Sequence, residues 1–329
     1  MALSSDELVK REIIDAFGDE IAGLDLRIFP ESSNDDQVLF TKGGLTFSYG
    51  GVDYGSCDAG WFRQEGDKII PFMGLEATDA LNRKSSGNAQ YQRFHHALGA
   101  VKNGLIGVYY LRKGIDKIQE DLYGMALKAT EHERGVYLII DDLDDLRPVL
   151  ENNNDPAKLN EAIGNILRKM QNKFNGKFMT RYRGSWEVFA EKRSTIFLDN
   201  NIVVKHAGRM RRNFTDGSQR AGHIAVGEMY LTKYFFYGKR IFYLMPKMSQ
   251  EDIDYLDEHK ASDKEWYLLR HEPMVEMKTR DNLIGLDQQT YDLLESIEDE
   301  PLKGDTLVAY NSCIKTIVQG LKDGTIKIQ

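Results

Sequence analysis

Two acidic residues, Asp58 and Glu76, are the side chains best suited to chemistry in this sequence. Glu76 directly follows the apolar run 69–75, and Asp58 lies 18 positions before it (76 − 58). On adjoining strands, two such carboxylates can face one metal ion. Mg²⁺ is commonly held by one or two carboxylates, with water, phosphate and carbonyl oxygens completing its shell, so the carbonyl of Ala77 is a natural third ligand. The competing interpretation is that Asp58 is a turn residue and Glu76 an ordinary strand-end acid, because Asp…Glu pairs are common.

The predicted helix after Glu76 carries polar side chains at helical spacing. The members of this polar stripe are Asn88, Gln92, His95, Gly99 and Lys102. Asn and Gln side chains can bind adenine edges, and Arg93 can bind guanine in the major groove. Lys102 would reach phosphate. Exposed helix faces are usually rich in Glu and Lys, yet residues 83–115 contain no acid. We therefore expect this helix to contact DNA, although a merely hydrophilic exposed face is the alternative.

The chain is acidic overall, with a net charge of −8, but its basic residues are concentrated in segments 81–117 and 203–240. Such segments can form a phosphate-binding face on an acidic protein. In the second segment the candidate DNA-binding residues are Arg209, Arg211, Arg212, Gln219 and Arg220. A flexible surface loop is the equally weighted alternative.

Several of these motifs together resemble the active-site region of type II restriction endonucleases of the PD-(D/E)xK nuclease superfamily. The residues concerned are Asp58-Ala59-Gly60, Leu75-Glu76-Ala77-Thr78 and Gly87-Asn88-Ala89 with Arg93 and His95. They are similar to the Asp-Gly-Gly, Glu-Ala-Lys and Gly-Asn-Ala-x-x-Arg-x-His succession of a six-base-cutting subgroup. The resemblance spans residues 56–114. It implies that Asp58 and Glu76 bind Mg²⁺, that the next helix contributes recognition, and that the substrate is double-stranded DNA. A palindromic target would favour a homodimer.

The sequence departs from this family at two positions. Thr78 stands where the family has a lysine that orients the attacking water, and Cys57 stands where it has proline. A threonine hydroxyl supplies no positive charge, so we expect Lys84 to reach back into the site. Glu12, on the first predicted helix, could act as a further carboxylate through water, as could Asp15 or Glu20.

Three functional hypotheses follow from these residues. The first is a Mg²⁺-dependent, sequence-specific endonuclease of the restriction type, with Asp58, Glu76 and Lys84 as catalytic residues. The second is a catalytically weak or inactive DNA-binding module on a nuclease-like scaffold, suggested by Thr78. The third is an enzyme whose basic loops recognise a phosphorylated small molecule.

Hydrophobic periodicity and turn residues predict the order of elements. We expect a helix over 6–22, strands over 45–49, 59–63 and 68–75, a helix from about 85 to 103, a strand over 105–111, a helix over 115–134 and a strand over 136–140. This is an α/β fold with a mixed central sheet flanked by helices, in the order αβββαβ. Additional C-terminal α+β elements are predicted as a helix over 155–174, strands and turns over 181–205, a helix over 222–237, a strand over 240–245 and a helix from 249.

The domain organisation follows from the same pattern. Residues 1–150 are expected to be a nuclease-like catalytic core, and 151–329 a DNA-binding or dimerisation region packed with it as one body. The hydrophobic fraction of 41% can supply a core. The two cysteines are far apart and suit a reduced environment. With no signal-peptide pattern and no apolar run of about 20 residues, a cytoplasmic protein without a membrane partner is expected.

Overall fold

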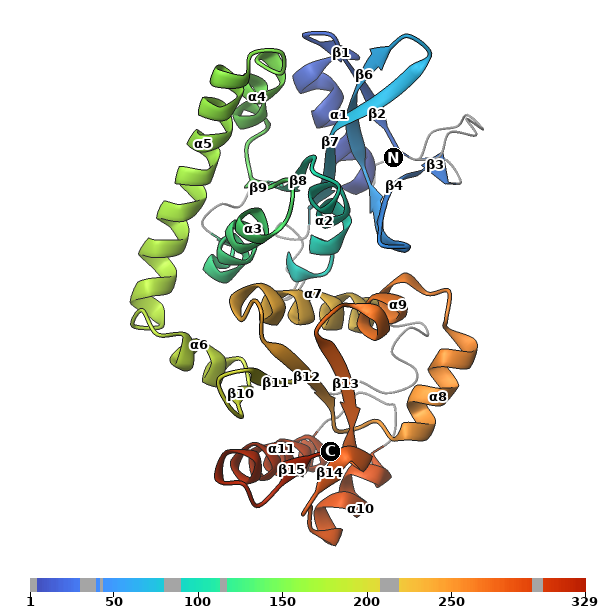
Figure 1. The fold of residues 1–329 in the computed structure, drawn as a ribbon, viewed down its shortest axis with the longest axis vertical. Helices are drawn as coiled ribbons and strands as arrows, with labels where there is room; N and C mark the ends of the chain where they lie inside the picture. Colours follow the sequence, from blue (N-terminus) through green and yellow to red (C-terminus); the bar gives the residue numbers. More distant parts are fainter. Residues whose placement is uncertain are drawn as a thin grey trace. The chain divides into compact units, whose positions relative to one another are not determined.

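The computed structural model describes residues 5–29, 40–41, 44–79, 90–112, 117–207, 219–297 and 304–329. The chain divides into two compact units, Met1–Arg181 and Tyr182–Gln329 (Figure 1). The division lies 31 residues later than the predicted one at 150 (181 − 150). The roles expected for the two parts stay predictions.

A six-stranded mixed sheet forms the centre of the first unit, in the order β1-β2-β6-β7-β8-β9. Its strands are β1 (Glu20–Ile21), β2 (Leu24–Ile28), β6 (Ala59–Glu65), β7 (Lys68–Thr78), β8 (Ile106–Leu111) and β9 (Val136–Ile140). Strands β2, β6 and β7 form an antiparallel meander, and β7, β8 and β9 are parallel. The accompanying helices are α1 (Ser5–Phe17), α2 (Phe94–Lys102) and α3 (Glu120–His132). The mixed α/β fold class with flanking helices is confirmed. The elements α1-β2-β6-β7-α2-β8 follow the predicted αβββαβ succession when β1 and the separate strands β3, β4 and β5 are set aside, with β2 in place of the predicted first strand.

Strand β8 shows why the sequence forms this sheet. All six of its residues are buried, as expected for a parallel strand covered on both faces, and its sequence is correspondingly an unbroken apolar and aromatic run. Helix α2 packs closely against it at Gly107. A Cβ atom there would lie 2.3 Å from the carbonyl oxygen of Ala97, so only glycine permits this approach.

The first strand of the meander was assigned wrongly from the sequence. The strand predicted over 45–49 exists as β4 (Gly44–Tyr49), but it belongs to a separate three-stranded sheet with β3 (Phe40–Thr41) and β5 (Val52–Cys57). The meander begins instead with β2, whose first residue, Leu24, lies two positions after the end of the helix predicted over 6–22. That helix ends earlier than expected, at Phe17, because Gly18 adopts a φ of 66° and its N–H bonds back to the Ile14 carbonyl.

The rest of the first unit consists of helical segments that follow β9 in the sequence. These are a 3₁₀ turn (Leu143–Leu146), α4 (Arg147–Glu151), α5 (Pro156–Lys173) and a π-helical segment (Phe174–Met179). The helix predicted over 155–174 is present, with the Asp155 side chain as its cap and Pro156 in its first turn. The Asp142 side chain accepts the Asp144 N–H at 3.0 Å and so caps the 3₁₀ turn.

The second unit contains a four-stranded sheet in the order β10-β11-β12-β13. Its strands are β10 (Thr195–Phe197), β11 (Ile202–His206), β12 (Arg240–Met245) and β13 (Val275–Thr279), with only the β10–β11 pair antiparallel. Its helices are α6 (Trp186–Lys192), α7 (Gln219–Phe235), α8 (Gln250–His259), α9 (Lys264–His271), α10 (Gln288–Ser296) and α11 (Gly304–Asp323), with a short β14 (Leu283–Ile284) and β15 (Lys327–Ile328) pair. Helix α6 was missed in the region expected to hold strands and turns; Ser185 caps it by accepting the Val188 N–H.

A buried apolar cluster joins α10 and α11 to the sheet of the second unit, with Phe242, Leu244, Leu294 and Ile317 among its members. None of the helices in the described part of the chain is long and apolar enough to cross a membrane.

Candidate functional site

Asp58, which joins β5 to β6, lies next to Glu76 of the neighbouring strand β7. Asp58 immediately precedes β6, and its backbone N–H donates to the Leu75 carbonyl of β7 at 2.9 Å. Its side-chain Oδ2 accepts the backbone N–H of Ala77 at 2.9 Å. This second bond holds the Asp58 carboxylate against the Glu76–Ala77 peptide, so the two acids form one site.

Glu76 is enclosed, with a side chain only 1% exposed, and two basic residues of the α2 region bind its carboxylate. The Arg93 Nη1 donates to Oε1 at 2.9 Å, and His96 Nδ1 lies 3.0 Å from Oε2. Burial by itself raises the pKa of Glu76, but the nearby His96 and Arg93 outweigh it and lower the pKa below its ordinary value. Glu76 is therefore held as a carboxylate.

The Arg93 guanidinium is coupled to both acids. Its pKa is raised chiefly by Glu76, and Asp58 contributes in the same direction. The Arg93 side chain is nevertheless 40% exposed, so it connects the enclosed carboxylates with solvent. Arg93, which we expected to bind guanine, places its positive charge beside Glu76.

Tyr109 is a further member of the site that the sequence reasoning missed. It is the register partner of Glu76 across β7 and β8. Its hydroxyl is buried and has no hydrogen-bond partner among the described residues. Burial raises its pKa strongly, and Glu76 adds to the effect. Its position in an apolar strand gave no signal of a polar role.

Cys57, at the position where the resembling family has proline, is also enclosed. Its Sγ donates to the His96 carbonyl at 3.6 Å. Burial, together with Glu76 and Asp58, raises the pKa of this thiol, so it stays protonated and acts as a packing residue.

The described members of the polar stripe expected on the helix after Glu76 are buried or half-buried. His95 is fully buried, and Lys102 is buried with its Nζ 3.0 Å from Glu133. Gly99 faces the Phe47 backbone, where a Cβ would lie 2.7 Å from the carbonyl oxygen. The expectation of an exposed stripe was wrong, because α2 is packed between other elements. Gln92 is half-buried beside it.

A second polar group lies where β7 and β8 end. The Arg112 side chain bonds both Glu12 oxygens, at 2.7 Å to Oε2 and 2.6 Å to Oε1, and reaches Asp79 at 3.2 Å. Its backbone N–H donates to the Thr78 carbonyl at 3.0 Å. Of the three acids considered on the N-terminal segment, Glu12 is linked through Arg112 to the end of β7, whereas Asp15 and Glu20 are exposed.

Several predicted site residues are not placed. Lys84, Asn88, Arg209, Arg211 and Arg212 lie outside the described residues. Gln219 and Arg220 begin α7 in the second unit, and the structure does not describe their side chains. The catalytic role of Lys84 and the DNA-binding roles of the other residues stay predictions.

Asp58 and Glu76 offer carboxylate oxygens, the ligand type that a hard divalent cation prefers, but they are only two side chains. Among the described residues, no group of three or more His, Cys, Asp or Glu side chains could hold a metal ion. Two carboxylates are sufficient for Mg²⁺ when substrate phosphate and water complete its shell. Arg93 and His96 occupy one lone pair on each oxygen of Glu76, so a cation there would use the remaining lone pairs or displace one of these two partners.

A scan against family models finds no match, and searches of curated proteins and of solved structures find none either.

Proposed function

We propose that the chain is a Mg²⁺-dependent endonuclease of the type II restriction kind that hydrolyses double-stranded DNA at specific sequences. The observation that supports it is the bond from the Ala77 N–H to the Asp58 carboxylate, which holds Asp58, just before β6, beside Glu76 of β7 in the mixed central sheet. This is the arrangement of acids and elements that the resemblance to PD-(D/E)xK nucleases implies.

Asp58 and Glu76 would hold the metal ion, with the Ala77 carbonyl as the expected third protein ligand. Bound Mg²⁺ would offset charge on the phosphoryl oxygens and lower the pKa of a coordinated water. The Arg93 side chain is 40% exposed, so its guanidinium can turn toward solvent. It would then leave Glu76 to the cation and stay close enough to bind the substrate phosphate.

Arg93 also offers a positive charge in a site where Thr78 has none. Its guanidinium lies 2.9 Å from Glu76, so a phosphate bound to a cation held by Glu76 would be within its reach. Lys84 remains the second candidate for this role. Homodimerisation on a palindromic target belongs to the same proposal.

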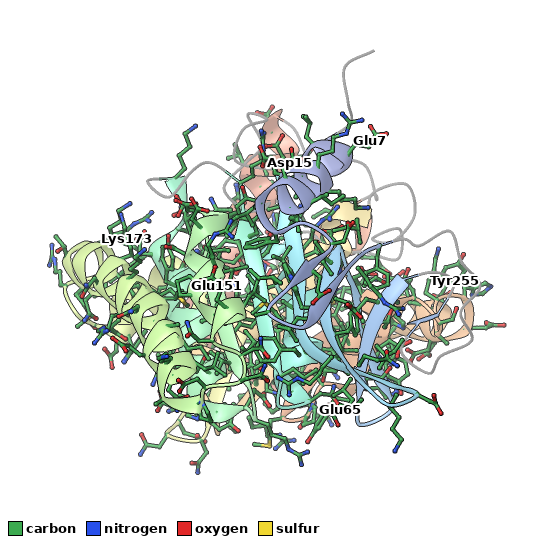
Figure 2. All side chains as sticks on the ribbon, turned by 90° about the horizontal axis from the view of Figure 1, so that it is seen from above. Glu7, Asp15, Glu65, Glu151, Lys173 and Tyr255 are labelled. Carbon is green, nitrogen blue, oxygen red and sulfur yellow. The ribbon has the colours of Figure 1, made fainter. Side chains whose placement is uncertain are left out.

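The test is incubation of long duplex DNA with Mg²⁺ and the wild-type chain, Asp58→Asn, Glu76→Gln or the control Glu65→Gln. Glu65 is an exposed acid at the end of β6 (Figure 2). Discrete fragments from the wild type and the control, with at least a ~10²-fold loss in both site variants, are expected for a metal-ligand pair. Intact DNA in all samples would contradict the proposal.

The second candidate function is a DNA-binding module without catalysis. It is favoured by the two basic side chains that occupy both oxygens of Glu76. Wild-type protein that binds duplex DNA tightly but leaves it intact in Mg²⁺ or Mn²⁺ would make this second function the better account.

A further inference from the structure

We infer that the solvent-facing side of α5 and the π-helical segment after it bind double-stranded DNA, with basic side chains on the phosphates and amides at the base edges. This inference rests on the proposed function, because it names the surface by which that nuclease would hold its substrate. It concerns only residues of the first unit.

The composition of this segment is unlike that of the chain as a whole. Residues 156–181 contain six basic residues, five amides and one acid, Glu161, in a protein of net charge −8. The basic residues are Lys158, Arg168, Lys169, Lys173, Lys177 and Arg181. Segment 162–181 has no acid at all. An ordinary solvated helix face carries Glu together with Lys, so this excess of positive charge and amides needs another explanation.

The burial pattern places the amides outward. Ala162, Ile166 and Met170 form the buried face of α5, and the Met170 sulfur accepts the Ile139 N–H of β9 at 3.4 Å. On the opposite face Asn165, Arg168 and Asn172 are exposed at spacing i, i+3 and i+7. They therefore form one continuous polar stripe along the helix.

Two further amides extend the stripe into the π-helical segment. Gln171 donates to the Asn175 Oδ1 at 2.8 Å, and Arg168 bonds the Asn165 side chain. These contacts between neighbours orient the side chains without burying them. Stacking of the Phe174 and Phe178 rings, whose centroids are 4.7 Å apart, anchors the segment beneath.

Basic side chains flank the stripe. The Lys169 side chain is 61% exposed and contacts Asp145 at 2.6 Å, and the Arg181 side chain is 52% exposed and contacts Glu120 at 2.8 Å. The exposed Lys169 ammonium gains little from its ion pair, so it yields readily to phosphate. The Glu120 side chain is only 7% exposed, so Arg181 is expected to stay paired with it and to reach phosphate with its remaining N–H groups. Figure 2 labels Lys173 on α5, where nitrogen-bearing side chains project from the helix.

Duplex DNA is the partner whose chemistry matches both features. Its phosphates take the basic side chains, and its major groove, about 12 Å wide, admits a helix and offers base edges to Asn, Gln and Arg. Helix α5 has 18 residues, roughly 27 Å at 1.5 Å per residue, comparable with one turn of DNA. Since α2 is enclosed, the first unit needs an exposed recognition element elsewhere, and α5 has the required side chains.

The test measures binding of the full chain to a 30-base-pair duplex in EDTA, where cleavage cannot occur, over a range of salt concentrations. Arg168→Gln/Lys169→Gln is expected to weaken binding about ten-fold and to reduce the slope of log K against log salt by about 1–2, since each phosphate contact contributes about 0.9. The matched control, Lys315→Gln/Lys322→Gln, removes the same charge from exposed positions of α11 and should leave binding unchanged.

A second variant examines the amides. Asn165→Ala/Asn172→Ala should retain the salt slope but bind a broader set of sequences when duplexes are selected from a random pool. Equal binding by wild type and Arg168→Gln/Lys169→Gln would overturn the inference, as would tighter binding to duplex RNA or polyglutamate than to DNA.

The outcomes separate this inference from the proposed function. If the α5 variant binds DNA weakly and the wild type never cleaves, the surface stands and the nuclease proposal fails. If Glu76-dependent cleavage occurs and the α5 variant binds normally, the nuclease stands and this surface is excluded.

Discussion

At the scale of single residues, Glu76 owes its charge to Arg93 and His96 rather than to water. A carboxylate this deeply enclosed is costly unless it is paired and hydrogen-bonded. Both of its oxygens have such a partner. The same contacts that keep Glu76 ionised therefore also couple the stability of the first unit to pH.

Glu76→Gln should show this coupling. The pKa of Glu76 is lowered in the folded protein, so its stabilisation is present above the unfolded pKa of about 4.3 and is lost as pH falls through the folded value. At pH 7 the variant should be about 3 kcal/mol less stable, because two basic groups lose their acid. Chemical denaturation between pH 7 and pH 3 should show the difference in unfolding free energy between wild type and variant becoming smaller as pH falls. An unchanged gap at pH 3 would mean that Glu76 is not the linked group.

Tyr109→Phe tests the buried hydroxyl beside Glu76. Because that hydroxyl has no hydrogen-bond partner among the described residues, its removal should cost nothing and can stabilise the protein by up to about 1 kcal/mol. Thermal unfolding of the variant beside wild type measures the change. A loss of more than about 1 kcal/mol would show that the hydroxyl has a partner, such as an ordered water.

At this scale the sequence predicts that Asp58 and Glu76 lie together, because both are acids at the ends of predicted strands. It does not predict that Arg93 and His96 bind Glu76. Arg93 was assigned to DNA because helical spacing shows which residues share a face, but not how that face is rotated against the sheet. Tyr109 was missed because an aromatic residue in a buried strand looks the same whether or not its hydroxyl lies in a site.

At the scale of elements, α2 is the helix that holds the site together. It contributes His96, follows Arg93 directly, and is enclosed along its length. Its close approach to β4 and β5 depends on Gly99, which faces Phe47 and Tyr54. The packing of this one helix therefore sets the position of both partners of Glu76.

Gly99→Ala should disrupt this packing. The added Cβ would lie 2.7 Å from the Phe47 carbonyl oxygen and 2.8 Å from the Tyr54 Cβ, so backbone must move, and a loss of about 2–3 kcal/mol is expected. Gly164→Ala in α5 is the control, because nothing lies within 4 Å of its added Cβ. There the better helix propensity of alanine should stabilise the protein by up to about 1 kcal/mol. Denaturation midpoints compare the two; equal effects would refute the packing argument.

Most elements of the first unit could be predicted, because long apolar strands and capped helices carry strong local signals. The β7, β8 and β9 strands and the capped start of α5 are examples. Strand β2 was missed because it is short and half-buried for most of its length, so alternation is weak. No local sequence signal distinguishes a strand of the central sheet from one of the three-stranded β3-β4-β5 sheet, because tertiary packing decides which strands pair.

At the scale of the whole molecule, each compact unit has its own sheets and its own buried charges. In the second unit Glu228 lies between two basic residues, 3.1 Å from Arg193 Nη1 and 3.2 Å from Lys205 Nζ. The Lys205 Nζ also donates to the Arg193 carbonyl at 2.6 Å. This triad ties α6 and α7 to β11.

Glu228→Gln should destabilise the second unit selectively. It leaves Lys205, whose side chain is 7% exposed, without an acid, at an expected cost of about 3 kcal/mol. Hydrogen exchange should rise in residues 182–329 and stay unchanged in 5–29 and 44–79. Glu258→Gln, at a side chain 79% exposed, is the control and should change neither. Equal acceleration in both units would show that they open together.

The central claim is that Asp58 and Glu76 share one divalent cation, and Mn²⁺ titration followed by electron paramagnetic resonance tests it most directly. The full chain would be titrated with duplex DNA present, and bound Mn²⁺ displaced with Mg²⁺. We predict a Mg²⁺-displaceable site in the wild type and in Glu65→Gln, and at least a ~10-fold weaker one in Asp58→Asn and Glu76→Gln. Mn²⁺ binding that is absent from the wild type, or unchanged in both site variants, would contradict the account.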